Sequence, residues 1–242
     1  MNLFCILCTL TSLTALAQDL PATVQLVDIS GSQQSFISFS GAMDFNETIE
    51  NGQRFEKQTG KAEGKNISGK SVVAVVVTFA WTGAEVPGGV DTIRHDHFFS
   101  SKDFAPGKTI DFPGEDSSVS INPAMKGADP SLTYTVKVGF IQFSDGSTWG
   151  DPRIGAELKM QRNDILAFYQ SLLSSYNAGD LQTFIATANT PPVSRQHQQL
   201  STAIGEQKRL QMILAGNGVQ GAVEFIKQRL AAGAAREAAG NF

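Results

Sequence analysis

Apolar and polar positions follow two different periods along the chain, and the change falls near residue 150. From about Ala22 to Trp149, short apolar runs alternate with polar positions, and Gly or Asn recurs about every 8 to 12 residues, which is typical of strands and turns. From Asp151 onward, apolar residues recur at helical spacing. The pattern predicts an α+β chain, with an antiparallel β-sandwich over residues 20–150, a helical region packing on it over 151–235, and a frayed tail over 236–242.

The segment 71–81 is the most apolar strand candidate. Side chains alternate between the two faces of a strand, and here one face is large and the other is mostly small. We expect the large face in the sandwich core and the small, still apolar face under the helical tail. The large residues are Val73, Val75, Val77, Phe79 and Trp81, and the small face consists of Val72, Ala74, Val76, Thr78 and Ala80.

A second strand candidate, over 132–149, changes its apolar parity part-way. A bulge near Gly139 explains the change, because one inserted residue moves every later side chain to the other face. Asp145-Gly146 then gives a strong hairpin-turn signal, with a short far arm ending at Trp149. The first apolar set is Leu132, Tyr134, Val136, Val138 and Phe140, and the second begins with Ile141 and Phe143.

Cap and breaker residues divide the second part of the chain into about four helices. Asp151 is a capping residue followed by Pro152, which the first helical position tolerates. Asn177 and Gly179 end this first helix, and Asp180 caps a short second one. A third helix is expected over about 193–215 and a fourth from Val219, with breaks at Pro191-Pro192 and at Asn217-Gly218.

Composition excludes one class of partner. The chain has 242 residues, of which 41% are hydrophobic and 17% charged, and its net charge is −4. These values describe an ordinary globular protein without the basic surface that nucleic acids or anionic lipids attract. We therefore expect no nucleic-acid partner.

The first 17 residues have the pattern of a secretory signal peptide. The apolar stretch Leu3–Leu16 is too short for a membrane helix, which needs about 20 apolar residues, and Ala15-Leu16-Ala17 is a small-x-small cleavage site. No Lys or Arg precedes the stretch, so an N-terminal anchor or a buried helix stays an alternative. Cleavage after Ala17 predicts a secreted or periplasmic protein without an integral membrane span.

Cleavage would also remove both cysteines, Cys5 and Cys8. The mature chain would then have no disulfide, thiolate nucleophile or cysteine-bound metal. A cysteine-free exported chain of this length fits a bacterial envelope or medium. Asn46-Glu47-Thr48 and Asn66-Ile67-Ser68 match the glycosylation sequon, which matters only in a eukaryotic secretory pathway.

Two turns resemble those of a known domain family. Gly64-Lys65-Asn66-Ile67-Ser68-Gly69-Lys70 before the valine-rich strand, and Phe104-Ala105-Pro106-Gly107-Lys108-Thr109, are similar to turns of the FxLYD-type immunoglobulin-like domains. The resemblance covers about residues 55–145, and no Phe-x-Leu-Tyr-Asp sequence occurs in the chain. It implies an Ig-like sandwich of exported bacterial proteins, with no catalytic site to carry over.

Arg94-His95-Asp96-His97 is the most polar cluster with possible chemistry. Two histidines at i and i+2 of a strand point the same way, but a zinc site needs three or four ligands. His197 lies far along the chain, and Asp91 or Asp103 would complete a site only if loops brought them in. The alternative is two solvated or packed imidazoles, and we assign no metal, catalytic or cofactor-binding residue.

Other candidate chemistry has simpler explanations. Glu115-Asp116 adjoins a Pro-Gly turn and is read as a solvated loop, and no Gly-x-Ser-x-Gly or phosphate-binding loop occurs. The stretch 83–89 is a flexible connection that in a sandwich is a candidate binding loop. Trp81 is assigned to the core, whereas Trp149 either seals the junction with the helices or is exposed as a stacking platform.

Three hypotheses about function remain. The first is a non-catalytic exported protein that works by binding a partner or envelope component. The second is a metal-binding protein or enzyme that uses His95 and His97. The third is a structural protein that self-associates through its helical tail. The sequence favours the first, and it leaves the ligand and the oligomeric state open.

Overall fold

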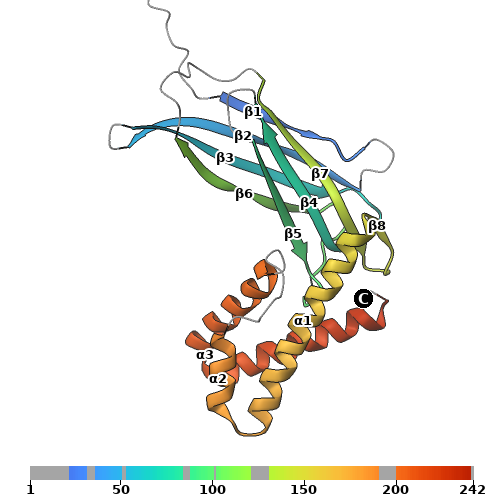
Figure 1. Ribbon diagram of the computed structural model, residues 1–242. Helices are drawn as coiled ribbons and strands as arrows, with labels where there is room; N and C mark the ends of the chain where they lie inside the picture. Colours follow the sequence, from blue (N-terminus) through green and yellow to red (C-terminus); the bar gives the residue numbers. More distant parts are fainter. Residues whose placement is uncertain are drawn as a thin grey trace, which may run out of the picture.

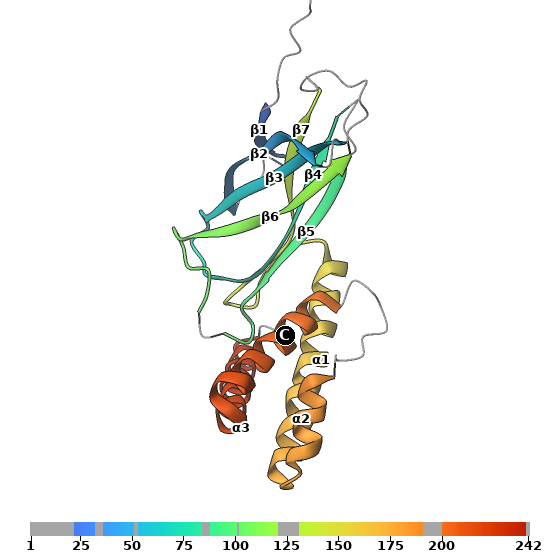
Figure 2. The same ribbon diagram turned by 90° about the vertical axis from the view of Figure 1, so that its left-hand side faces the viewer.

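The computed structural model describes residues 22–31, 36–50, 53–83, 88–100, 102–120, 131–190 and 200–240. The expected signal peptide, with Cys5 and Cys8, therefore lies outside the described residues. A β-barrel-like domain stands at one end of the molecule and the helices stand at the other (Figures 1 and 2). The strands are β1 (Ala22–Asp28), β2 (Ile37–Glu50), β3 (Gln53–Asn66), β4 (Val72–Thr82), β5 (Gly89–Asp96), β6 (Thr109–Ser120), β7 (Thr133–Phe143) and β8 (Thr148–Gly150).

The strands form one mixed sheet in the order β5-β4-β7-β1-β2-β3-β6, with β8 added to β7. The sheet curls until its two ends, β5 and β6, approach each other, so that the barrel is nearly closed. At this seam the ring centroids of His95 and Phe112 lie 4.8 Å apart. All pairings are antiparallel except that of β1 with β7.

The expected antiparallel Ig-like sandwich is wrong, and β1 is the reason. Its first half, Ala22–Gln25, pairs with β2, and its second half, Leu26–Asp28, pairs in parallel with β7. One strand thus joins what would have been two separate sheets into a single curved one. Its inner face holds one continuous apolar core, whose buried members include Ile37, Met43, Val75, Val77, Phe79, Phe112, Tyr134 and Val136.

The bulge predicted near Gly139 is confirmed. The pairing of β4 with β7 shifts register between Val76 and Val77, so that Val77 pairs with Val138 and Val76 with Phe140. As a result Val138 and Ile141 both point into the barrel, whereas Phe140, which was expected inside, points out toward the helices. A Cβ on Gly139 would lie 2.9 Å from Ile154 Cδ1, so the glycine lets the first helix approach the strand closely.

The two faces of β4 are largely as predicted. Val75, Val77 and Phe79 face the barrel core, while Ala74 and Val76 are buried under a helix. The exception is the start of the strand, where a second register shift between Val72 and Ala74 turns Val72 inward and Val73 outward. The helical region therefore covers the small face only at Ala74 and Val76, whereas Thr78 lies farther along the strand in an exposed hydrogen-bond contact with Thr92.

In the part of the chain that the structure describes, three helices follow the sheet, rather than the four expected. They are α1 (Pro152–Asn177), α2 (Leu181–Asn189) and α3 (Leu200–Ala238). The Asp151 carboxylate accepts a hydrogen bond from Arg153 N and Asp180 accepts one from Thr183 N, which confirms both predicted caps. The predicted break at Asn217-Gly218 is confirmed, because Gly218, with φ 68° and ψ −172°, interrupts the helical backbone and divides α3 into two segments that meet at a kink.

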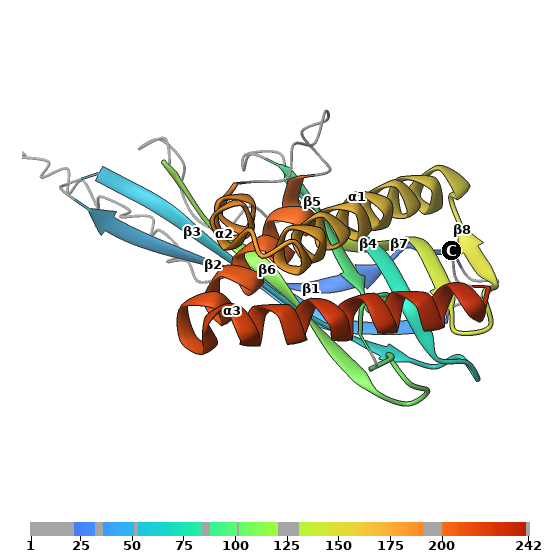
Figure 3. The ribbon, with the colours of Figure 1, turned by 90° about the horizontal axis from the view of Figure 1, so that it is seen from below.

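The helices cover one end of the barrel (Figure 3). The first turns of α1 pack on β4 and β7 through Leu158 and Ile154. Phe98 and Phe99, in the turn after β5, insert among the helices and share a second core with them. Other members of this core are Ile165, Tyr169, Leu172, Phe184, Leu210, Val223 and Ile226.

The expected frayed tail from residue 236 is helical through Ala238. Arg236 forms an ion pair with Asp103 and also donates to Ser100 O, which fastens the end of α3 to the turn after β5. Gly240 then reaches the turn between β7 and β8, where its carbonyl oxygen lies 2.7 Å from the place of a Cβ on Gly146. Side-chain contacts thus hold the tail in place where composition alone suggested fraying.

Candidate functional site

His95 takes part in packing at the barrel seam. Its ring meets Phe112 edge-on at 4.8 Å, and its Nε2 atom is buried without a hydrogen-bond partner among the described residues. Burial lowers the pKa of His95 below its usual value, and the nearby His97 lowers it further. The imidazole is therefore neutral at physiological pH.

His97 follows β5, and its backbone N–H donates to Val73 O at 2.8 Å. Its Nε2 atom is also buried without a partner in the described part of the chain, and burial lowers its pKa in spite of Asp96 and Asp103 nearby. No group of three or more His, Cys, Asp or Glu within the described ranges is placed to hold a metal ion. The described residues therefore supply no third ligand for a metal ion at His95 and His97. His197 lies outside the described residues.

The charged members of the same cluster join the barrel to the helices. Asp96 accepts two hydrogen bonds from Arg162 of α1, each of 2.9 Å, and both side chains are almost fully buried. Arg162 also donates to Gln142 Oε1 at 2.7 Å and lies over the Phe98 ring. Arg94 pairs with Glu157 of α1 at 3.2 Å. The polar cluster that the sequence marked for chemistry is therefore a structural junction.

The remaining acidic candidates are dispersed. Asp103 pairs with Arg236. Asp91 lies near Tyr134, and together with burial, the larger cause, it raises the pKa of that phenol to about 12. Glu115 and Asp116 lie in strand β6, where Asp116 pairs with Thr59, so the expected solvated loop at this place is wrong. Their side chains lie outside the described residues, as does most of the expected binding loop at 83–89. None of these acids joins His95 or His97 in a described catalytic group.

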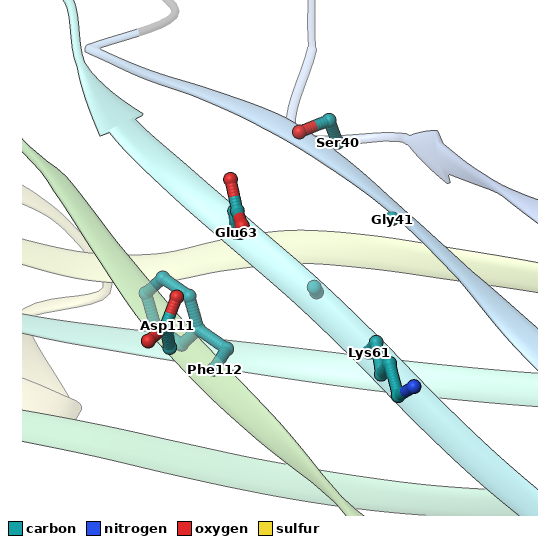
Figure 4. Close-up of a pocket in the computed structure, with 7 residues that line it drawn as sticks. Ser40, Gly41, Lys61, Glu63, Asp111 and Phe112 are labelled. Carbon is teal, nitrogen blue, oxygen red and sulfur yellow. The ribbon is translucent and has the colours of Figure 1, made fainter.

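A shallow groove of about 440 Å³ crosses the outside of β2, β3 and β6 (Figure 4). Ser40, Glu63 and Asp111 lie in one row across the three strands, because Ser40 pairs with Glu63 and Glu63 with Asp111. Lys61 borders the groove farther along β3. These polar side chains are exposed, and two like charges placed opposite each other weaken the sheet locally. The groove therefore offers a hydrated surface of mixed charge.

A second pocket, of about 700 Å³, has an aromatic wall. Its lining includes Thr148 and Trp149 of β8, the strand that precedes α1 in the chain. Phe36, Phe143 and Trp149 line it, and the Phe36 ring meets Phe143 at 5.2 Å and Trp149 at 5.8 Å, both edge-on. Phe143 is buried, whereas Phe36 and Trp149 are partly exposed. Aromatic surface that is both rigid and accessible favours ligand binding.

Polar groups form the rim of this aromatic pocket. Lys70 Nζ lies 2.6 Å from Asp145 Oδ2, 3.1 Å from Ser147 Oγ and 5.5 Å from the centre of the Phe143 ring. Hydrogen bonds from Lys70 and Ser147 hold the pKa of Asp145 well below its usual range. The carboxylate is therefore ionised at all physiological pH values and is a poor proton donor or base.

The turn that carries Lys70 is built on a fully buried asparagine. Asn66 Nδ2 donates to Lys70 O at 2.9 Å and to Phe104 O at 2.7 Å, and its Oδ1 accepts from Ser68 N at 2.9 Å. The two turns that resemble FxLYD-type domains thus contact each other, and they set the position of Lys70 at the pocket. The resemblance itself stays a prediction, although the Ig-like fold that it implied is not the one observed.

Sequence reasoning found one part of this pocket. Trp149 was predicted either at the junction with the helices or exposed, and the structure places it, partly exposed, in the pocket wall against Phe36 and the barrel core. Phe36 and Lys70 were missed, because nothing in their local sequence marks them as neighbours of Trp149. Only the pairing of distant strands brings the three together.

Comparisons with known proteins add little to this description. No family model and no curated protein matches the chain. One similar solved structure is that of a hypothetical protein from Peptoclostridium difficile 630, with 10% identity, a TM-score of 0.25, and coverage of 53% of this chain and 92% of that chain. So low a score carries no argument about fold or function. Among the helices described, none has the length and apolar character to cross a membrane.

Proposed function

We propose that this protein is an exported, non-catalytic binding module and that the aromatic pocket beside β8 is its binding site. The observation that carries the proposal is the wall formed by Phe36, Phe143 and Trp149, which comes from three separate segments and is fixed by edge-on ring contacts. Such a wall binds a ligand without first having to become ordered, which reduces the entropic cost of association.

The chemistry of the rim supports binding rather than catalysis. The charged residue that lines it, Lys70, is paired at 2.6 Å with Asp145 beside the pocket. Asp145 has a lowered pKa, whereas a general acid or base works best with a pKa near the operating pH. The pocket therefore offers apolar surface and fixed hydrogen-bonding groups, without an acid or base tuned for proton transfer.

A cross-linking capture experiment tests the site. The mature chain, residues 18–242, is incubated with the envelope fraction of its source organism, beside the Trp149→Ala variant and a control, Met212→Ala. Met212 is an exposed apolar residue of α3, so its truncation removes surface away from the pocket. We expect one component captured by the wild type and the control and lost with Trp149→Ala. Equal capture by all three proteins, or none by any, contradicts the proposal.

Export is the second part of the proposal and rests on the residue pattern of positions 1–17. Intact-mass analysis of the protein isolated from its own source tests it directly. We expect a chain that begins at Gln18, found in the periplasm or medium. A full-length chain that retains Met1 in the cytoplasm contradicts export and leaves the pocket proposal intact.

A further inference from the structure

We propose that the ligand of the aromatic pocket is a neutral carbohydrate, bound with a sugar ring against Trp149. This inference rests on the proposed function and adds the chemical class of the ligand. It follows from three properties of the pocket: its two-sided lining, the cancellation of charge on its rim, and the hydrogen-bonding capacity that its rim residues retain.

The lining of the pocket is divided into an apolar and a polar part. Phe36, Phe143 and Trp149 supply the aromatic wall, while Lys70, Ser147 and Thr148 supply polar groups at the rim. A pyranose ring has the matching division, since its C–H groups form apolar faces and its hydroxyl groups project around the edge. A ligand that is apolar throughout would leave the rim unused.

The charge of the rim argues against an ionic ligand. Lys70 and Asp145 lie 2.6 Å apart, so their charges largely cancel at the distance of a ligand. An anion that approached Lys70 would meet Asp145, and a cation would meet Lys70. A neutral ligand whose groups both donate and accept hydrogen bonds is repelled by neither charge.

The rim keeps hydrogen-bonding capacity for such a ligand. An ammonium group has three donors, and Lys70 directs its donors to Asp145 and Ser147, which leaves one for a ligand. The Asp145 carboxylate can accept more bonds than those it receives from Lys70 and Ser147. Thr148 is exposed and adds a hydroxyl that can donate or accept. A sugar hydroxyl does both, and so can bridge Lys70 and Asp145.

These groups are also held in position before a ligand arrives. Lys70 is fixed by its ion pair, by Ser147 and by the Phe143 ring, and the backbone around it is fixed by Asn66. The turn that carries Asp145 rests on the end of α3, where Gly240 approaches Gly146. A carbohydrate gains little per contact, so it benefits from a site whose side chains need no further ordering.

Tryptophan fluorescence gives the test. The chain has two tryptophans, Trp81 and Trp149, so Trp81→Phe leaves Trp149 as the single reporter. This variant is titrated with maltotriose, cellotriose and chitotriose, and a neutral glycan array widens the search. We expect saturable binding of at least one neutral glycan, weakened about tenfold or more by Trp149→Ala and about threefold by Lys70→Met, as measured by calorimetry.

Two controls keep the outcomes separate. Trp149→Phe retains a ring and should bind better than Trp149→Ala, and circular dichroism confirms that each variant is folded. If no glycan binds the folded protein while the capture experiment still yields a component dependent on Trp149, or a peptide library binds there instead, the carbohydrate inference fails and the binding module stands. If neither experiment gives binding dependent on Trp149, both proposals fail.

Discussion

Two ion pairs in this protein each join a basic side chain to an aspartate, but in opposite surroundings. Arg162 and Asp96 lie 2.9 Å apart at the junction of barrel and helices, with 3% and 10% of their side chains exposed. Lys70 and Asp145 lie 2.6 Å apart at the rim of the aromatic pocket, with 51% and 50% exposed. The buried pair joins β5 to α1, whereas the exposed pair is open to solvent and, in the function proposed above, to a ligand. The proposal therefore assigns a structural role to the buried pair and a binding role to the exposed one.

Removing one partner of the buried pair should have the largest effect on stability. Arg162→Met leaves the Asp96 carboxylate buried without its cation, and we expect a loss of about 3–5 kcal/mol in the free energy of unfolding, measured by urea denaturation. Arg209→Met is the matched control, since Arg209 is 53% exposed, and it should change stability little. A loss as small as that of Arg209→Met would show that the buried pair does not hold the junction.

The partly buried pair between Arg236 and Asp103 should have an intermediate effect. Arg236→Met removes this pair and the hydrogen bond to Ser100 O, and we expect a loss of about 1–3 kcal/mol in urea denaturation. In this variant, the rate of amide hydrogen exchange should increase more in the last turns of α3 than in β7, relative to the wild type. Unchanged exchange there would contradict the view that Arg236 fastens the tail.

The two partly buried histidines, His95 and His97, should make stability depend on pH. Burial lowers the pKa of His95 and His97 in the folded protein below the ordinary histidine value of 6.5. As pH falls below 6.5, the two histidines become protonated in the unfolded chain but stay neutral in the folded protein. The free energy of unfolding therefore decreases until the pH reaches the pKa of the histidines in the folded protein. Urea denaturation between pH 7.5 and 5 should show this fall. The double variant His95→Gln/His97→Gln should flatten the curve, and an unchanged slope would refute the assignment.

The exposed pair should have the smallest effect on stability. Lys70→Met should leave the urea midpoint within experimental error, because an exposed pair contributes little and the methionine keeps much of the apolar contact with Phe143. A clear shift of the midpoint would mean that Lys70 is a structural residue, and the contrast with Arg162 would no longer hold.

Local features of the fold were predictable from the sequence, and long-range ones were not. The bulge at Gly139, the caps at Asp151 and Asp180 and the hairpin at Asp145-Gly146 each depend on a few adjacent residues, and all are confirmed. The barrel was missed because it depends on β1 pairing with both β2 and β7, which no local pattern encodes. An Ig-like sandwich and this barrel require the same alternation of apolar and polar residues within each strand, so this pattern does not distinguish the two folds.

The residues of the candidate site were also only partly predictable from the sequence. His95 and His97 attracted attention because they are rare polar residues in a short motif, yet the His95 ring packs on Phe112 and the Nε2 atoms of both histidines are buried without a hydrogen-bond partner in the described part of the chain. Phe36 and Lys70 are ordinary residues, and their importance arises only from meeting Trp149 across distant segments. The sequence predicted Trp149 as one of two possibilities, and the rest of the pocket required the fold.

The buried Asn66 has a consequence for how this protein can be produced. It is the acceptor residue of an Asn-Ile-Ser sequon, and its side-chain nitrogen is committed to Lys70 O and Phe104 O in the folded barrel. A eukaryotic secretory host attaches glycans while the chain is still unfolded, so an oligosaccharide at Asn66 would occupy a place that the folded barrel has no room for. Yeast or mammalian secretion should therefore yield retained, misfolded material, and a bacterial host is the safer choice for every experiment described above.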